Sequence, residues 1–328
     1  MHKGRPLVLL LVSFICFGGL AAEDVSLWEY ANPAADVILY VNTKQPEKAM
    51  NKRLWKRISR DRERAIAEDP DGQFFDTKGR DLELVANLHI VSMSPFCGSI
   101  DGVANITGNL QGDIDKLLGS LKENGGIQPQ ITKQDNRQFY NLSLPQMEQL
   151  PPADIMLVPI GSNQVQFRIN ISPKGKMVQQ TLNTSKQGSP LTAGLRSREL
   201  AFACSAYTDK FSTIPLTATD NARELNAFLQ KLKLLCVSGY VDGLYLIVDA
   251  SFLFKTITDA AEFSEKAKTF LTQLLPVMGA KDMPKTVLNG SQLAISLKID
   301  IAASWNLISR VTSNKNGPTM KKSKKGNE

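Results

Sequence analysis

Apolar residues recur along the chain in short continuous or alternating runs bounded by turn residues, and such runs predict strands. In the first half of the chain, strands are expected over residues 37–41, 82–90, 102–107 and 138–142. In the second half, they are expected over residues 154–158, 165–171, 199–207, 244–248 and 293–299. The chain is therefore predicted to be rich in short strands.

Helices are expected where apolar residues recur every three or four positions. Met50, Leu54 and Ile58 form such a stripe within a helix expected over residues 47–67. Asp259 and Glu262 form a capping pair at the start of another helix. Further helices are expected over residues 113–122, near 174–182, from 220 to 232 and over 305–308.

Two segments have a similar pattern of Pro, a small residue and Asp before an apolar run. They are residues 32–41 and 150–159, separated by 118 positions. The chain is therefore interpreted as two related α+β units, over 33–149 and 150–312, with mainly antiparallel sheets covered by helices. In the first unit, the expected order of elements is β-α-β-β-α-β, which is the ferredoxin-like arrangement.

The two ends differ from these units. Residues 1–22 combine a short positive region, an uncharged apolar run and small residues at Gly19 and Ala21, which predicts a cleaved signal peptide. An uncleaved anchor is the alternative, but the apolar run is shorter than the ~20 residues that a membrane span needs. We expect the protein to be secreted or periplasmic. Residues 313–328 lack apolar periodicity and are expected to form a basic, disordered tail.

This layout resembles a group of exported bacterial proteins of unknown function. The resemblance depends on Pro33-Ala34-Ala35-Asp36 before the first strand and on residues 102–108 followed directly by a helix. It also depends on a short strand near Tyr140. The resemblance implies a duplicated α+β fold and an exported location, and it transfers no catalytic residue.

The chain has a composition typical of globular proteins, with 42% hydrophobic and 22% charged residues among 328. Its formal net charge is +7. The basic residues concentrate in two places: residues 44–64 have a net charge of +6, and the segment from 311 onward has +4. Without these segments and the signal peptide, the remainder has a net charge of −5. This distribution argues against general nucleic-acid binding and favours local electrostatic contacts.

The basic segment 44–64 is the candidate binding site. A basic amphipathic helix of this kind can lie on an anionic membrane or polymer. The simpler interpretation is that its apolar stripe packs on the sheet while its charges face solvent. The residues expected to contact an anionic surface are Lys48, Lys52, Arg53, Lys56, Arg57 and Arg60.

The remaining residue types give little support to enzymatic chemistry. His89 is the one histidine after the signal peptide, and it is interpreted as a structural or surface residue of a strand. Asp69, Asp71 and Asp76 lack the spacing of a calcium loop, and no nucleotide-binding or hydrolase motif is found. No catalytic residue, metal site or cofactor is predicted. Cys204 and Cys236 are interpreted as buried thiols, with a disulfide between them as the alternative.

We therefore expect a non-catalytic exported protein that binds an envelope protein, an anionic polymer or a membrane surface. Two alternatives stay open at this point. One is an envelope hydrolase that uses carboxylates, and the other is a carrier of an apolar ligand held between sheet and helices. A deep pocket with converging carboxylates supports the hydrolase, whereas an apolar cavity supports the carrier.

Overall fold

The structure is a computed structural model that describes most of the chain from residue 27 to residue 306. The described residues are 27–32, 34–68, 81–93, 96–125, 127–134, 137–146, 151–172, 200–209, 227–274 and 282–306. The expected signal peptide, the expected helix near 174–182, the acidic residues 69–76 and the basic tail lie outside this set. These expectations stay predictions.

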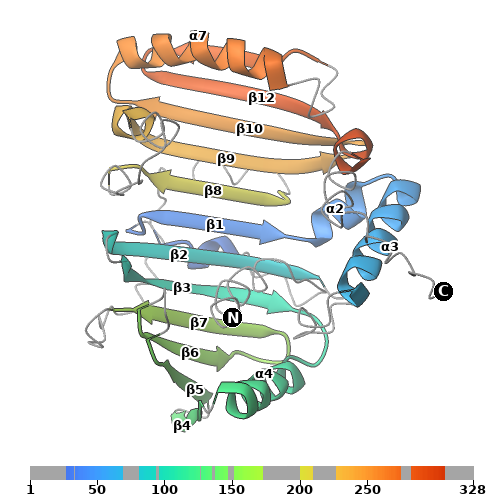
Figure 1. Ribbon diagram of the computed structural model, residues 1–328, viewed down its shortest axis with the longest axis vertical. Coiled ribbons are helices and arrows are strands. Elements are labelled where there is room, and N and C mark those ends of the chain that lie inside the picture. Colours follow the sequence, from blue (N-terminus) through green and yellow to red (C-terminus); the bar gives the residue numbers. More distant parts are fainter. Residues whose placement is uncertain are drawn as a thin grey trace, which may run out of the picture.

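The fold is mixed α+β and is built on one large antiparallel sheet (Figure 1). Its strands are β1 (Val37–Asn42), β2 (Leu82–Met93), β3 (Phe96–Ile106), β4 (Gln130–Gln134), β5 (Arg137–Leu144), β6 (Ala153–Pro159), β7 (Gln164–Ile171), β8 (Phe202–Tyr207), β9 (Leu232–Asp242), β10 (Tyr245–Phe254), β11 (Lys285–Asn289) and β12 (Gln292–Asp300). They lie side by side in the order β11-β12-β10-β9-β8-β1-β2-β3-β7-β6-β5-β4.

Few helices accompany this sheet within the described ranges. They are the short 3₁₀ helix η1 (Leu27–Tyr30), α2 (Lys44–Ala49), α3 (Lys52–Glu68), α4 (Leu110–Gly125) and α7 (Ile257–Leu274). Residues 227–231 and 301–306 are also helical. The expected helix over 220–232 therefore ends one residue early, because Leu232 is already the first residue of β9.

The single sheet differs from the expectation of separate sheets for two units. β6 and β7 follow residue 150, yet they lie between β5 and β3, which precede it. β1 in turn pairs with β8 from the later part of the chain. An apolar run predicts that a strand forms, but it does not select the neighbour with which the strand pairs, so the sequence pattern left this joining undetected.

The ferredoxin-like arrangement is not confirmed. β1 pairs antiparallel with β2, from Val37 opposite Leu88 to Asn42 opposite Glu83, so α2 and α3 do not form a crossover between parallel strands. The repeated segments also occupy unlike positions, because β1 lies in the middle of the sheet and β6 near one edge.

The order of elements is nevertheless similar on the two sides of the β1–β8 pair. β2, β3, α4, β4 and β5 follow one another on one side, and β9, β10, α7, β11 and β12 do so on the other.

The helix expected over 47–67 is divided into two. Met50 has an extended backbone and forms an isolated bridge with Gly243 in the β9–β10 turn, which ends α2. The side chain of Asn51 then accepts a hydrogen bond from the backbone N–H of Arg53 (3.0 Å) and begins α3. The division places α3 at the ends of the strands, where Figure 1 shows it beside the sheet.

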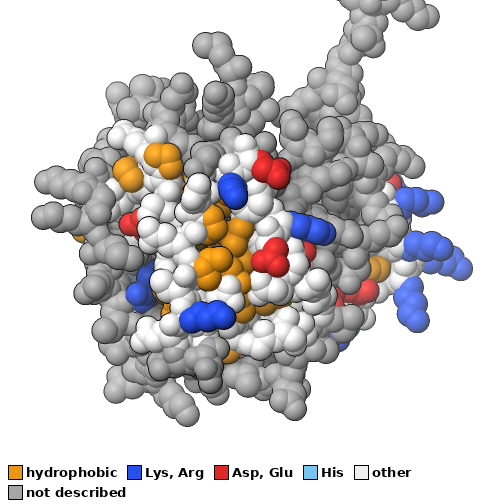
Figure 2. Space-filling model, turned by 90° about the horizontal axis from the view of Figure 1, so that it is seen from below, with side chains coloured by type: hydrophobic (Ala, Val, Ile, Leu, Met, Phe, Trp, Pro, Cys, Tyr) orange, Lys and Arg blue, Asp and Glu red, His pale blue; other side chains and the backbone are white. Residues whose placement is uncertain are grey.

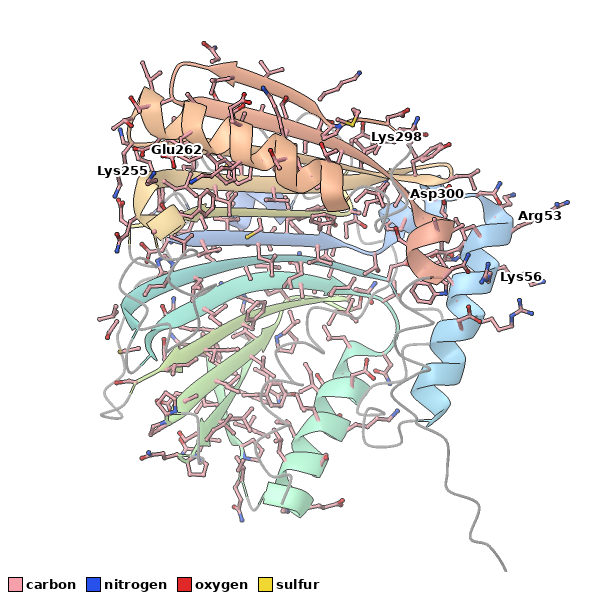
Figure 3. The ribbon with its side chains drawn as sticks, turned by 45° about the horizontal axis from the view of Figure 1, so that its top comes forward. Arg53, Lys56, Lys255, Glu262, Lys298 and Asp300 are labelled. Carbon is pink, nitrogen blue, oxygen red and sulfur yellow. The ribbon has the colours of Figure 1, made fainter. Side chains whose placement is uncertain are left out.

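The two faces of the sheet are covered differently. On the face defined by Leu84, Phe167 and Phe252, which we call the helix-covered face, α4 and α7 bury two separate clusters. On the opposite face, η1 packs against Ile38, Val85 and other residues of the central strands. Figure 3 shows α3, α4 and α7 around one side of a curved sheet. Among the described residues, no helix is both long and apolar enough to cross a bilayer.

Candidate anionic-surface contact

The apolar stripe of α3 holds the helix against the sheet. Leu54 is buried together with Met50 and Val241, the latter near the end of β9. Trp55 and Ile58 pack around this cluster, along with residues of the helix 301–306. The predicted stripe is therefore used for packing, at the ends of β9 and β10 rather than across the face of the sheet.

Polar contacts fix α3 to the helix 301–306. The indole N–H of Trp305 donates to Oδ2 of Asp61 (3.0 Å), and Nη2 of Arg57 donates to Oδ1 of Asn306 (2.6 Å). Nε of Arg57 also lies 3.9 Å from Oδ2 of Asp61. Arg57 therefore has a structural role in addition to its charge.

The other side of α3 presents the basic residues to solvent. All six residues of the predicted contact are exposed, and five of them lie on α3. Lys52, Lys56 and Arg60 follow one another at intervals of four residues, so they share one side of the helix, and Arg53 lies beside them. Figure 3 shows Arg53 and Lys56 pointing away from the body of the protein. Figure 2 shows Lys and Arg side chains projecting on the side where α3 lies.

The structure thus brings the predicted contact residues together. Lys48 is on α2 and is not without an interaction partner. Among the side chains that the structure describes, which leave out residues 62–68 of α3, no carboxylate forms an ion pair with Lys52, Arg53, Lys56 or Arg60. We call these four cations the basic stripe.

His89 belongs to a buried polar group on the opposite face. Its Nε2 lies 3.1 Å from Oδ1 of Asp101, and Asn87 donates to Oδ2 of Asp101 (3.2 Å). Asn87 also donates to the backbone carbonyl of Tyr30 and accepts from the backbone N–H of Asn32. The group holds the segment after η1 against β2, which is a structural role. Within the described ranges, no cluster of three or more His, Cys, Asp or Glu residues is arranged to hold a metal ion.

The cysteines do not form the alternative disulfide. Cys97, Cys204 and Cys236 are all free. Cys204 lies opposite Val237 and Cys236 lies opposite Ser205, so the thiols of Cys204 and Cys236 point to different faces of the sheet. Burial raises the pKa of both thiols above the ordinary value of 9.0.

Comparison with known proteins adds no functional information. The chain matches no family model and no curated protein. It is similar to crystal forms I, III and IV of TP0453, with 13–14% sequence identity and TM-scores of 0.42–0.43. These matches cover 87–89% of this chain and 96–100% of TP0453. At this level of similarity, they support no conclusion about function.

Proposed function

We propose that this protein is an exported, non-catalytic binding protein that attaches to an anionic membrane surface through the basic stripe of α3. The observation that carries the proposal is the combination of an apolar side used for internal packing and a basic side left in solvent. The export component depends on the signal-peptide pattern of residues 1–22.

The expected contact is peripheral and electrostatic. Because Leu54 and Ile58 pack against the sheet and the helix 301–306, they do not contribute to insertion into the acyl region. A basic residue near an anionic membrane contributes about 1 kcal/mol, so three of them provide a useful but salt-sensitive attraction. An anionic polymer or an acidic envelope protein is the alternative partner for the same charges.

The duplicated architecture is also part of this proposal. We place the relation between the halves at the β1–β8 pair, because the same order of elements follows on both sides of it. The hairpin of β6 and β7, inserted between β3 and β5, is then an addition to one half. In this arrangement, α4 and α7 are equivalent helices, while α3 is the element that provides the basic stripe.

The experiment measures binding of the purified protein to vesicles of phosphatidylcholine, with and without phosphatidylglycerol. Binding is measured at about 0.1 M and about 1 M salt, where the Debye length is about 10 Å and about 3 Å. We expect binding only to the anionic vesicles and only at the lower salt. The triple variant Lys52→Glu, Lys56→Glu, Arg60→Glu should weaken it by about 100-fold or more, since about 3 kcal/mol is removed.

The matched control reverses three lysines elsewhere on the surface. Lys116, Lys133 and Lys285 are exposed residues of α4, β4 and β11, and changing all three to Glu alters the net charge equally. We expect this control to retain most of the binding. Equal losses in the two variants, or no binding of the unchanged protein, contradict the proposal. Binding to soluble polyglutamate but not to vesicles assigns the stripe to an anionic polymer instead.

A further inference from the structure

The sheet of the described chain has two open edges, with β11 at one end of the strand order and β4 at the other. An edge strand presents N–H and C=O groups that have no partner in the ladder, and soluble proteins often protect such strands with charged side chains, especially Lys. The two edges differ in this protection. β4 has a Lys next to its centre and Gln at both ends, whereas β11 has a Lys at its first position, followed by Thr, Val, Leu and Asn.

Apolar side chains are exposed at the β11 edge. Seven large apolar side chains are exposed in the described chain, and three of them, Met283, Val287 and Leu288, lie in β11 or shortly before it. Val287 is 62% exposed and Leu288 is 44% exposed, and as neighbours in a strand they point to opposite faces of the sheet. The edge is therefore apolar on both faces. A partner that covers both side chains has to lie beside the strand rather than on either face.

The register shows which backbone groups of β11 point outward. The N–H of Phe254 on β10 donates to the C=O of Ser291 (2.9 Å), so this carbonyl at the start of β12 is directed to β10. Successive residues of a strand direct their backbone groups to alternate sides, so Ala294, three residues later, is directed to β11, where its partner is Val287. The two residues that flank Val287 in β11 therefore direct their N–H and C=O groups away from the sheet.

These outward groups are complementary to those of a second copy of β11. When two copies lie antiparallel about a twofold axis at Val287, Thr286 of each copy stands opposite Leu288 of the other, and each such pair exchanges both of its hydrogen bonds. The two Val287 side chains then meet at the axis in the closely spaced, non-hydrogen-bonded type of pair. Lys285 stands opposite Asn289 of the other copy, so like charges do not face each other.

The β4 edge is less suited to either role in such a contact. A symmetric pair of β4 strands about Thr132 places Ile131 opposite Lys133, which sets an apolar side chain against a cation. A contact between β11 of one copy and β4 of the next is heterologous, and heterologous contacts continue from copy to copy into open chains. The β11 pair, by contrast, is closed after two copies.

We infer that this protein forms a symmetric homodimer in which the two β11 strands pair antiparallel about Val287, so that one sheet continues through both copies. The inference goes beyond the proposed membrane attachment and does not depend on it, because α3 packs at the ends of β9 and β10 and not at the β11 edge.

The contact is short, which sets the expected strength of the dimer. β11 has five residues, and Pro284 directly before it has no N–H and so limits the ladder to the strand. Such a contact belongs to the small interfaces, below about 1,200 Å², which are typical of weak association. The dimer is therefore expected to form progressively as the protein concentration rises.

Cross-linking at Val287 tests the pairing directly. The Cα atoms of a non-hydrogen-bonded antiparallel pair are about 4.5 Å apart, within the range of about 4.4–6.8 Å that a disulfide spans. Val287→Cys is introduced into a variant whose four natural cysteines are replaced by Ser, and copper phenanthroline is added as the oxidant. We expect a disulfide-linked dimer to form at least about tenfold faster than with Val91→Cys, because pairing holds the thiols together.

Val91 is the matched control for collisions between copies. It is 63% exposed, almost the same as Val287, but it lies on β2 in the interior of the strand order. Its thiol variant therefore measures how fast exposed cysteines of this protein meet by diffusion alone.

Sedimentation measures the dimer without a cross-link. The average mass of the unchanged protein should rise with concentration from one copy towards two. Val287→Lys places like charges directly opposite each other at the axis and should weaken the dimer by about tenfold or more, whereas Val91→Lys adds the same charge elsewhere and should leave the dimer unchanged. Circular dichroism checks folding. Because Val287→Cys is a smaller change, cross-linking decides the question even if a Lys variant does not fold.

The outcomes also separate this inference from the proposed function. A single-copy mass at every concentration, or a Val287→Cys variant that cross-links no faster than Val91→Cys, overturns the inference even if the protein binds anionic vesicles. Equal effects of Val287→Lys and Val91→Lys on the dimer overturn it as well. Cross-linking of Val287→Cys only when it is mixed with Thr132→Cys assigns the contact to β4 and rejects the symmetric pair. A β11 dimer that ignores anionic vesicles supports the inference and rejects the membrane attachment.

Discussion

Gln45 and Val241 exchange two hydrogen bonds although they are 196 positions apart in the chain. The side-chain amide of Gln45 donates to the carbonyl of Val241 and accepts from its N–H, each at 2.9 Å. Gln45 thus pairs with β9 as a neighbouring strand would. Because both groups are buried, the pair fixes α2, and with it the start of α3, at the end of the sheet.

Replacing Gln45 by Ala should lower the free energy of unfolding by about 1–3 kcal/mol, because it leaves the N–H and carbonyl of Val241 without partners in a buried site. Urea unfolding followed by circular dichroism measures the change. Gln128→Ala is the control, since Gln128 is exposed, and it should change stability by less than about 0.5 kcal/mol. Equal effects in the two variants contradict the structural role of Gln45.

Gly239 is needed because the ring of Phe202 lies over it. A Cβ atom at residue 239 would be 2.3 Å from Cε1 of Phe202, on the neighbouring strand. Gly239→Ala should therefore destabilise the protein by about 1–3 kcal/mol, as overpacking does. Adding Phe202→Leu should recover part of this loss, and a double-mutant cycle measures the coupling.

Gly119→Ala is the matched control for this substitution. Gly119 lies inside α4, and a Cβ atom added there would have nothing within 4 Å of it beyond its own stretch of helix. Ala favours a helix interior over Gly by about 0.5–1 kcal/mol, so the control should raise the unfolding midpoint. A destabilisation by Gly119→Ala shows that α4 is packed more tightly than the structure indicates.

Trp305 fixes the outer side of α3 through its hydrogen bond to Asp61. Trp305→Phe keeps an aromatic ring but removes the donor, and we expect a loss of about 1 kcal/mol in the free energy of unfolding. Asp61→Asn combined with Trp305→Phe should cost little more than the single change, because the two side chains act on the same bond. Fully additive losses in urea unfolding contradict this contact.

The ion network on α7 predicts a dependence of stability on pH. Hydrogen bonds from Lys231 and Lys266 lower the pKa of Glu262 from 4.5 to about 2. Since the pKa is lower in the folded protein, the stabilisation is present above pH ~4.5 and is lost as the pH falls towards 2. Glu262→Gln should flatten this part of the stability curve, and NMR titration of the carboxylate gives the folded pKa. A folded pKa near 4.5 is incompatible with the network.

Much of the secondary structure was predictable because most strands begin and end with turn residues. The strands β1, β5, β6, β7 and β12 lie within a few residues of the predicted ranges. β4, β9 and β11 were missed. Most residues of β4 and β11 are exposed, and their sequences show no apolar alternation. β9 is less exposed, but its start at Leu232 continues the helical spacing of the segment before it, which concealed the strand. The division of the helix expected over 47–67 was also missed. Asn51 is a residue type that favours the start of a helix, and it caps α3, but the apolar stripe continues across it and so indicated one helix. Similarly, the cap of α7 is Thr256, whose hydroxyl accepts from the N–H of Asp259, three residues before the expected position.

The basic stripe was predictable from the sequence, whereas the pairing of strands that forms the sheet was not. The basic stripe depends on spacing within one helix, so Lys52, Lys56 and Arg60 could be grouped from the sequence alone. The sheet depends on the register between strands from both halves, such as Leu39 opposite Cys204. Continuous apolar runs do not show which residues share a face, so the two faces of the sheet emerge only once the strands are paired.

The position of β1 affects how the chain reaches its final form during synthesis. β2 follows β1 closely in the sequence, but its other neighbour, β8, begins only at Phe202. One edge of β1 therefore lacks its hydrogen-bond partner while all the intervening segments are made, and this edge is open to pairing with other chains. Segment 37–42 is therefore where premature pairing between two chains is expected until residues 202–207 are available.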